Sequence, residues 1–330
     1  MKIAIIGAGA IGGYIGGMLA QAQAGGADLD VSLLARGAHL AAIQADGLRI
    51  ESKEASFTVR PRASDDPAAL GPQDMLFITV KAPALPELAP RLKPLIGPET
   101  AWVTAMNGIP YWYFHGHAGP LAGHRLASCD PQGNIWRDLP PERAIGGVLW
   151  LPASVPQPGL IRRGNGNSVS LGEPDGSNTG RIEKLAAALR AAGVQAPLRP
   201  NIRQDIWHKL WGNLSFSPIA VLTHSTLAEM AGDAGTRALA RSMMLEAQAV
   251  GHALGINFPV DVDTRIEESA QIGMHKPSML QDLEAGRPME IEQITGVIAE
   301  LGRLTGNPTP TIDLMLALVR RRAATLLQRK

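Results

Sequence analysis

The chain opens with MKIAIIGAGAIGG (residues 1–13), which joins a short apolar run to closely spaced glycines. Lys2–Ile6 has the length and aliphatic character of a buried strand, and Ala10–Gln23 has the pattern of a helix. Glycine is a poor helix former, so the glycines between residues 7 and 17 argue against a secretory signal sequence. The stretch instead predicts a strand, a tight turn and a helix at the start of an α/β domain.

The turn between this strand and helix has the G-x-G-x-x-G spacing of a dinucleotide-binding loop. The first glycine allows the tight turn, the second lets a diphosphate approach backbone N–H groups, and the third lets the helix pack closely on the strand. The free N–H groups at the helix N-terminus then attract the diphosphate. The predicted cofactor-binding residues of this loop are Gly7, Ala8, Gly9, Ala10, Ile11 and Gly12.

The second predicted strand, Val31–Leu34, indicates which dinucleotide binds. A site for NAD usually offers Asp or Glu after this strand, as an acceptor for the ribose 2′-hydroxyl. Here the strand runs into Ala35-Arg36-Gly37, without a carboxylate. Arg36 can pair with a 2′-phosphate, so the sequence predicts NADP(H). The alternative is that Arg36 is a solvated surface charge.

Short apolar runs alternate with helical patterns through the first 200 residues, and this alternation is typical of a parallel sheet covered on both faces. Residues 110–143, rich in Gly, Pro, aromatics and His, are predicted as an irregular insertion. Short strands over 145–151, 158–163 and 168–172 are expected to add a mixed or antiparallel edge. The other predicted strands are 75–80, 101–105 and 194–198, and the other predicted helices are 38–45, 87–96 and 179–192.

Pro200 and Asn201 mark a helix stop followed by an N-cap, and no strand pattern follows them. The predicted fold class is α/β, with a Rossmann-type doubly wound sheet and an all-helical C-terminal domain. The predicted domains are an NADP-binding domain over 1–200 and a helical substrate and catalytic domain over 201–330. The predicted helices of the second domain are 202–216, 234–254, 260–273, 290–305 and 310–328.

The composition excludes several classes of protein. The 330 residues carry 31 Lys and Arg against 30 Asp and Glu, which leaves no electrostatic footprint for nucleic acid or an anionic membrane. No stretch has the uninterrupted apolar length of a membrane span. Cys129 is the only cysteine, so a disulfide framework is excluded. Cys129 is interpreted as a structural residue. A cytoplasmic protein is expected.

Three patterns in both halves resemble the ketopantoate reductase (2-dehydropantoate 2-reductase) family. The strand ends Val80-Lys81-Ala82 and Met106-Asn107-Gly108 join residues 1–13 in resembling its cofactor half. The run Lys209-Leu-Trp-Gly-Asn213 is similar to its catalytic helix. The runs Ser278-Met-Leu-Gln-Asp282 and Glu290-Ile-Glu292 are similar to its substrate-binding signature. The resemblance implies an oxidoreductase of pantothenate biosynthesis that uses NADPH to reduce a small 2-oxo acid, with ketopantoate the expected substrate.

The resemblance also implies roles for individual residues. Lys209 would be the general acid that protonates the alkoxide formed when hydride reaches C2, and Glu290 would hold the hydroxyl as a second catalytic residue. Without the resemblance, Lys209 would read as a surface charge and Glu290 as an N-terminal helix carboxylate. The implied substrate-binding residues are Asn107, Asn213, Ser217 and Ser278, and Lys81 and Asn107 are also placed at the cofactor.

Two departures from the family pattern leave alternatives open. Ser217-Pro218 stands where the family commonly has Asn-Pro, so a reductase of another 2-oxo acid is one alternative. A non-catalytic protein that senses NADP is another. His115, His117 and His124 in the insertion have no fourth ligand at zinc-site spacing, so no metal site is predicted. An aromatic lid or a subunit contact is expected there, and Arg320–Arg322 is read as either a homodimer surface or a solvated face.

Overall fold

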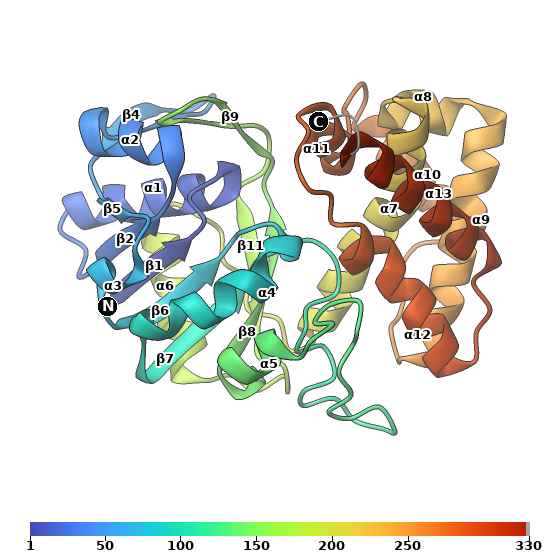
Figure 1. Cartoon of the computed structure of the whole chain (residues 1–330), viewed down its shortest axis with the longest axis horizontal. Helices are drawn as coiled ribbons and strands as arrows, with labels where there is room; N and C mark the ends of the chain where they lie inside the picture. Colours follow the sequence, from blue (N-terminus) through green and yellow to red (C-terminus); the bar gives the residue numbers. More distant parts are fainter. Residues whose placement is uncertain (328–330) are drawn as a thin grey trace.

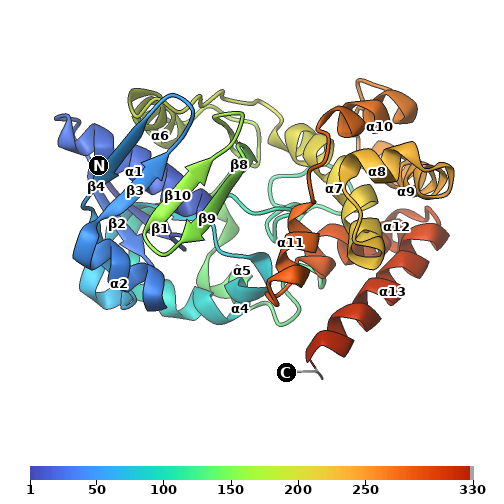
Figure 2. The same ribbon diagram turned by 90° about the horizontal axis from the view of Figure 1, so that it is seen from above.

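The structure is a computed structural model that describes residues 1–327, and it divides into a sheet-bearing part and a helical part. The two parts lie side by side in both views (Figures 1 and 2). The predicted fold class, an α/β part followed by an all-helical part, is confirmed. The strands are β1 (Lys2–Ile6), β2 (Asp30–Leu34), β3 (Leu48–Glu51), β4 (Ser56–Val59), β5 (Arg62–Ser64), β6 (Gln73–Ile78), β7 (Ile96–Thr104), β8 (Ala144–Trp150), β9 (Ala153–Gln157), β10 (Leu160–Arg163) and β11 (Ser168–Gly172).

The helices of the sheet-bearing part are mostly short. The predicted helix over 87–96 is broken into a short α-helix and 3₁₀ segments. Its recurrent prolines (Pro86, Pro90 and Pro94) lack the N–H groups that a continuous α-helix requires. The helices are α1 (Ala10–Ala24), α2 (Gly37–Asp46), α3 (Pro67–Leu70), α4 (Leu85–Leu88), α5 (Asn134–Asp138) and α6 (Gly180–Ala191), with the 3₁₀ segments η1 (Ala82–Ala84), η2 (Ala89–Leu95) and η3 (Pro141–Arg143).

The main sheet has seven strands in the order β11-β8-β7-β6-β1-β2-β5. All neighbours pair in parallel except β11, which runs antiparallel to β8 at one edge, as predicted for 168–172. The chain leaves β1 toward β2 on one side and later returns to β6 on its other side. Open α/β sheets bind ligands at such a switch point, beyond the carboxyl ends of the strands. The dinucleotide loop after β1 and Lys81 after β6 both lie at this point.

A second sheet, in the order β4-β3-β10-β9, was not predicted. The strand predicted over 158–163 therefore lies in this sheet as β10, and not at the edge of the main sheet. Helix α1 packs between the two sheets. A Cβ atom on Gly13 would lie 2.7 Å from Ile161, and one on Gly17 would lie 2.5 Å from Ile50. These glycines let the small sheet approach the helix closely.

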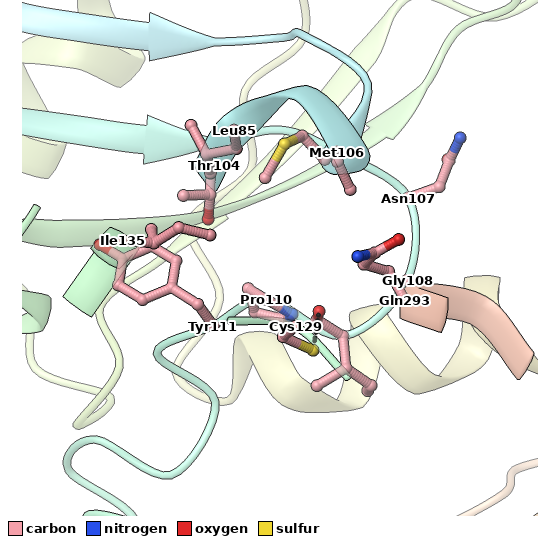
Figure 3. Close-up of a pocket in the computed structure, with 12 residues that line it drawn as sticks. Leu85, Thr104, Met106, Asn107, Gly108, Pro110, Tyr111, Cys129, Ile135 and Gln293 are labelled. Atoms are coloured by element: carbon pink, nitrogen blue, oxygen red, sulfur yellow. Dashed lines mark hydrogen bonds between the residues drawn. The ribbon is translucent and has the colours of Figure 1, made fainter. Parts of the chain in front are cut away.

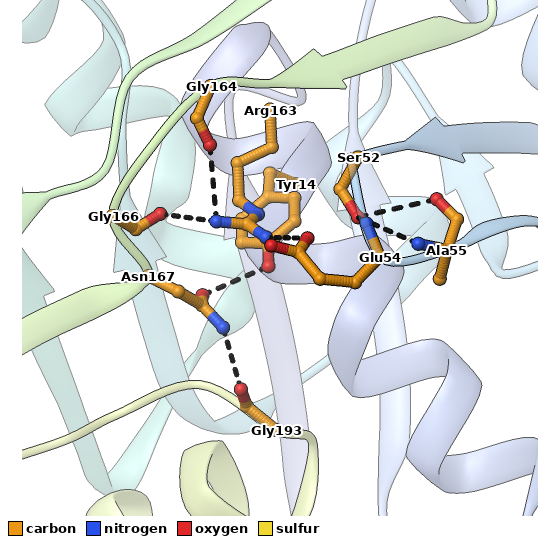
Figure 4. Close-up of polar contacts among 9 residues, drawn as sticks. All are labelled: Tyr14, Ser52, Glu54, Ala55, Arg163, Gly164, Gly166, Asn167 and Gly193. Carbon is orange, nitrogen blue, oxygen red and sulfur yellow. Dashed lines mark hydrogen bonds and ion pairs between the residues drawn. The ribbon is translucent and has the colours of Figure 1, made fainter.

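A cluster of polar contacts around Tyr14 of α1 connects the helix to residues of both sheets and their connections (Figure 4). The Tyr14 hydroxyl donates to Asn167 Oδ1 at 2.9 Å, and the Asn167 amide donates to the Gly193 carbonyl at 2.7 Å. The Arg163 guanidinium lies over the Tyr14 ring, 5.6 Å from its centroid, and pairs with Glu54 of the β3–β4 connection. The cluster fixes α1, and with it the loop that begins the helix.

Helices make up the rest of the described chain. Among residues 1–327, no helix is both long and apolar enough to cross a membrane. The predicted strand over 194–198 forms only isolated bridges, through Gln195 and Leu198. The last predicted helix, 310–328, ends at residue 328, which lies outside the described residues. The helices are α7 (Ile202–Thr223), α8 (Leu227–Gly232), α9 (Ala234–Ala253), α10 (Val262–Gln271), α11 (Ser278–Glu284), α12 (Val297–Thr305) and α13 (Pro310–Leu327), with a π-helical segment η4 (Glu292–Gly296) before α12.

Several of these helices differ from the prediction. Helix α7 runs past Pro218 and is longer than the predicted 202–216, while α8 and α11 were missed. The predicted helix over 290–305 begins as the π segment η4. Of the arginine triplet, Arg320 forms an ion pair with Glu292, and Arg322 contacts His224.

The segment 110–143 joins the two parts of the chain. Its aromatic run Tyr111–Phe114 is fully buried in the core, so the expectation of an aromatic lid over the substrate is wrong. The buried Arg203 of α7 donates to the carbonyls of Tyr113, His115 and Pro174, and Trp207 Nε1 donates to the Tyr113 hydroxyl at 2.7 Å. These bonds fix the start of α7 on the sheet-bearing part.

Candidate active site

The loop after β1 forms an open cradle at the switch point. Gly7 has φ 95°, and its N–H donates to the Leu34 carbonyl at the end of β2. A Cβ on Gly12 would lie 2.2 Å from the Gly7 carbonyl, whereas a Cβ on Gly9 would meet nothing within 4 Å. The loop is therefore packed tightly on the strand side and open where a diphosphate would approach.

Arg36 lies two residues beyond the carboxyl end of β2, and the loop that forms the cradle follows the carboxyl end of the neighbouring strand β1. Arg36 is the N-cap residue of α2 and is exposed. Its guanidinium makes no hydrogen bond or ion pair within the described residues. A cation without a protein partner, at the place where the adenosine ribose of a dinucleotide lies, is suited to a 2′-phosphate.

Glu290 of the helical part contacts three residues of the sheet-bearing part. It is buried and immediately precedes the short helical stretch that begins at Ile291. Its Oε1 accepts from the Ala82 N–H at 3.2 Å, and its Oε2 accepts from Asn107 Nδ2 at 3.1 Å and Lys81 Nζ at 3.4 Å. The structure therefore brings three predicted site residues, Lys81, Asn107 and Glu290, into contact beyond the carboxyl ends of β6 and β7.

Asp282 is a second buried carboxylate at this site, and the sequence analysis did not select it. Its Oδ2 lies 2.6 Å from Lys81 Nζ, and its Oδ1 accepts from Arg287 Nε at 3.0 Å. Burial disfavours the Lys81 ammonium, but Glu290 and Asp282 outweigh this effect and raise the pKa of Lys81. Asp282 ends the Ser278–Asp282 run and stands one helical turn after Ser278, which is the signal that could have identified it.

Lys209 lies on α7, close enough to Glu290 for the charge of that carboxylate to act on it. Its side chain is partly buried and makes no hydrogen bond within the described residues. Desolvation lowers the pKa of Lys209 to about 8; the nearby Lys81 ammonium acts in the same direction, and Glu290 opposes both. Lys209 can therefore give up a proton near neutral pH more readily than an exposed lysine can.

The other predicted substrate residues lie on the helices behind Lys209. Asn213 and Ser217 follow it at successive helical turns of α7, and Ser278 is the first residue of α11, which packs on α7. Ser217 is buried, while Asn213 and Ser278 are partly buried. Their side chains make no hydrogen bonds within the described part of the chain, so their polar groups are available to a ligand.

The connection after Asn107 is held by the π-helical segment η4. Gly108 has φ 88°, and a Cβ there would lie 2.1 Å from the Gln293 carbonyl, which accepts from the Ile109 N–H at 3.1 Å. π-helical segments are often found at functional sites. The contact between Gly108 and Gln293 was not predicted, because a π-helical segment has no sequence pattern that distinguishes it from an α-helix.

Next to Asn107 lies a small cavity of about 20 Å³, which has room for about one water molecule. Its lining is largely apolar, and Figure 3 shows the Asn107 side chain pointing away from it. Cys129 lines the cavity, and burial raises the pKa of its thiol, which donates to the Ile109 carbonyl. The cavity is therefore too small to hold a substrate. Within residues 1–327, no three His, Cys, Asp or Glu side chains are grouped as metal ligands.

Comparison with known proteins places this arrangement in context. Residues 3–176 match the family model described as ketopantoate reductase PanE/ApbA, and residues 201–323 match the model of its C-terminal part. A 2-dehydropantoate 2-reductase from Mesorhizobium japonicum is 53% identical over 325 residues, with 98% of each chain covered.

Two solved structures extend the comparison. A protein from Ralstonia solanacearum, which carries a provisional ketopantoate reductase assignment, has a TM-score of 0.92 at 42% identity, with 98% of each chain covered. A D-mandelate dehydrogenase in complex with NADH has a TM-score of 0.80 at 25% identity, with 99% of this chain and 100% of that chain covered.

Proposed function

Because this chain belongs to the ketopantoate reductase family and is an oxidoreductase, we propose that it reduces 2-dehydropantoate (ketopantoate) to pantoate with NADPH. The observation that carries the proposal is the position of Glu290. This buried carboxylate is bound by Lys81, Asn107 and the Ala82 N–H, and it faces a lysine, Lys209, whose pKa is lowered. The cytoplasm is proposed as the location, since the buried Cys129 is a free thiol.

The residues at the switch point suit a nicotinamide dinucleotide. The open space at Gly9 and the N-terminus of α1 would hold the diphosphate, and Arg36 would hold the 2′-phosphate of NADPH. Lys81 and Asn107, at the ends of neighbouring strands, would lie where the cofactor meets the substrate. When bound, NADPH supplies the hydride for C2 of the ketone.

Lys209 supplies the proton in this proposal. The carbonyl oxygen of the substrate gains negative charge as C2 is reduced, and the Lys209 ammonium donates a hydrogen bond and then the proton to it. Glu290 accepts a hydrogen bond from the resulting hydroxyl and stabilises the ammonium before transfer. The substrate carboxylate would be bound by Asn213, Ser217 and Ser278, whose side chains form no hydrogen bond to any residue of 1–327.

A direct test is to mix the purified protein with NADPH and ketopantoate and follow the absorbance of the reduced nicotinamide. We expect absorbance to fall only when both are present, and pantoate to form in an amount equal to the NADPH consumed. NADPH binding without turnover on any 2-oxo acid would contradict the proposal and favour a non-catalytic NADP sensor.

Ser217 favours one second candidate, a reductase of another 2-oxo acid. Serine is shorter than the asparagine that is common in the family, so this buried position offers less volume and one hydroxyl instead of an amide. The D-mandelate dehydrogenase has a similar fold and is named for a different 2-hydroxy acid. A higher kcat/KM for a 2-oxo acid other than ketopantoate would support this candidate.

Replacing Arg36 by alanine is expected to weaken NADPH binding by a factor of about 10–100 and to leave NADH binding within about twofold. The reason is that the guanidinium would lose a charge-assisted contact to the 2′-phosphate, which NADH lacks. The measurement is the Kd of each dinucleotide by fluorescence titration. Arg91→Ala is the control, because Arg91 is an exposed arginine in η2, away from the end of β2. Equal loss of affinity for both dinucleotides in Arg36→Ala would contradict the assignment.

A further inference from the structure

A chain of charged groups crosses from the helical part to the sheet-bearing part beside Glu290. Arg287 Nε donates to Asp282 Oδ1 at 3.0 Å, and Asp282 Oδ2 lies 2.6 Å from Lys81 Nζ. The Arg287 backbone N–H also donates to the Asp282 carbonyl at 2.8 Å. Asp282 is buried, whereas Arg287 is largely exposed. Each oxygen of the buried carboxylate therefore faces one cation.

Lys81 is shared unequally between two carboxylates. Its ammonium is 2.6 Å from Asp282 and 3.4 Å from Glu290. The closer pair is the stronger one, because Coulomb attraction falls with distance. Without Asp282, the nearest remaining anion for Lys81 would be Glu290, and the ammonium would be expected to move onto it.

We propose that Asp282, oriented by Arg287, is a positioning residue that draws the Lys81 ammonium toward itself, so that Lys81 contacts Glu290 only at the longer distance of 3.4 Å and the Glu290 carboxylate stays available to the substrate and to Lys209. This inference rests on the proposed reductase function. Asp282 and Arg287 act through Lys81 and Glu290, and neither is assigned a contact with substrate or cofactor.

The proposal makes a directional prediction, because the two residues carry opposite charges. The charged groups that act on the pKa of Lys209 are Glu290 and Lys81, and those in contact with Asp282 are Lys81 and Arg287. Asp282→Asn removes a negative charge and lets Lys81 neutralise Glu290, so the Lys209 ammonium becomes less stable. Arg287→Gln removes a positive charge and strengthens the hold of Asp282 on Lys81, so the ammonium becomes more stable.

The test measures the titration of Lys209 without requiring turnover. The unliganded protein is treated with a lysine-acylating reagent at a series of pH values, and the labelling rate of the Lys209 peptide is followed by mass spectrometry. We expect the midpoint to fall by about 0.5–1 pH unit in Asp282→Asn and to rise by a smaller amount in Arg287→Gln. The alkaline limb of kcat/KM for ketopantoate should move in the same directions, with kcat about tenfold lower in Asp282→Asn.

Two further variants make the result specific. Glu284→Gln removes the same charge from α11, but Glu284 is paired with Lys276, so the Lys209 midpoint should not move. Arg287→Lys keeps the charge and should restore the wild-type midpoint. If Asp282→Asn does not fold, as judged by thermal unfolding, the comparison of Arg287→Gln with Arg287→Lys alone tests the proposal.

Unshifted midpoints in Asp282→Asn and Arg287→Gln, or shifts in the same direction, would overturn the proposal. So would a lower melting temperature as the only effect, since that is what a purely structural role gives. Failure of the wild-type protein to reduce any 2-oxo acid would instead contradict the proposed function, and the labelling result would still stand as a separate measurement.

Discussion

Replacing Lys209 by alanine is expected to reduce kcat for ketopantoate by a factor of about 10²–10⁴, the range usual for loss of a general acid. The dissociation constant of NADPH should stay within about twofold, because Lys209 lies on α7 and not on the dinucleotide loop. The measurement is steady-state turnover together with cofactor titration. Loss of both turnover and cofactor affinity would point to a disturbed active-site structure rather than to a missing proton donor.

Lys209→Met is the matched control for folding. Methionine keeps most of the side-chain volume and removes the charge. The lowered pKa of Lys209 means that the ammonium is less stable in the folded protein than in the unfolded chain below pH 8. Lys209→Met should therefore melt at a temperature no lower than that of the wild type near neutral pH while remaining inactive. Near-normal turnover in either variant would remove Lys209 from the proposed mechanism.

The same group should set the pH dependence of the reaction. A general acid must be protonated to act, and kcat/KM reports ionisations of the free enzyme. The pKa of Lys209 is about 8, so kcat/KM should be level below this value and fall about tenfold per pH unit above it. A plateau that extends to the range of an exposed lysine would contradict this assignment.

The fold could be predicted largely from local patterns. The 1–13 stretch, the strand and helix alternation and the loss of strand patterns after Pro200 identify an α/β part and a helical part, and both were found. The second sheet was missed because β3, β4 and β9 are short or exposed, and because β3 and β10 pack on α1 through contacts that no local window contains. The burial of the 110–114 aromatics likewise depends on Arg203 and Trp207, far along the chain.

The site divides in the same way. Lys81, Asn107 and Glu290 could be selected because strand ends and a family-like motif mark them, and they do lie in contact. Arg287 could not, since a guanidinium on a loop is an ordinary surface group, and Asp282 was marked only by its place at the end of the Ser278–Asp282 run. Only the packing of α11 against the end of β6 reveals the ion pair with Lys81.

Replacing Glu290 by glutamine is expected to reduce kcat/KM for ketopantoate by a factor of about 10²–10³. The carboxylate accepts from three donors, Lys81, Asn107 and the Ala82 N–H. Bonds from charged donors are roughly twice as strong as neutral ones, and an amide N–H₂ turned toward Lys81 or Asn107 leaves a buried donor without an acceptor. Glu290 also stabilises the Lys209 ammonium, so the alkaline limb of kcat/KM should move to lower pH.

Two variants separate these effects from general damage. Glu292→Gln removes the same charge two residues away, where the side chain is exposed and paired with Arg320, and should leave kcat/KM within about twofold. Glu290→Asp keeps the charge on a shorter side chain, so it should restore the position of the alkaline limb more fully than the rate. A Glu290→Gln protein with the wild-type rate and an unmoved limb would show that Lys81 and Asn107, and not the carboxylate between them, organise the substrate. An equal loss in Glu292→Gln would place the effect in the π-helical segment, which begins at Glu292 and which Glu290 precedes.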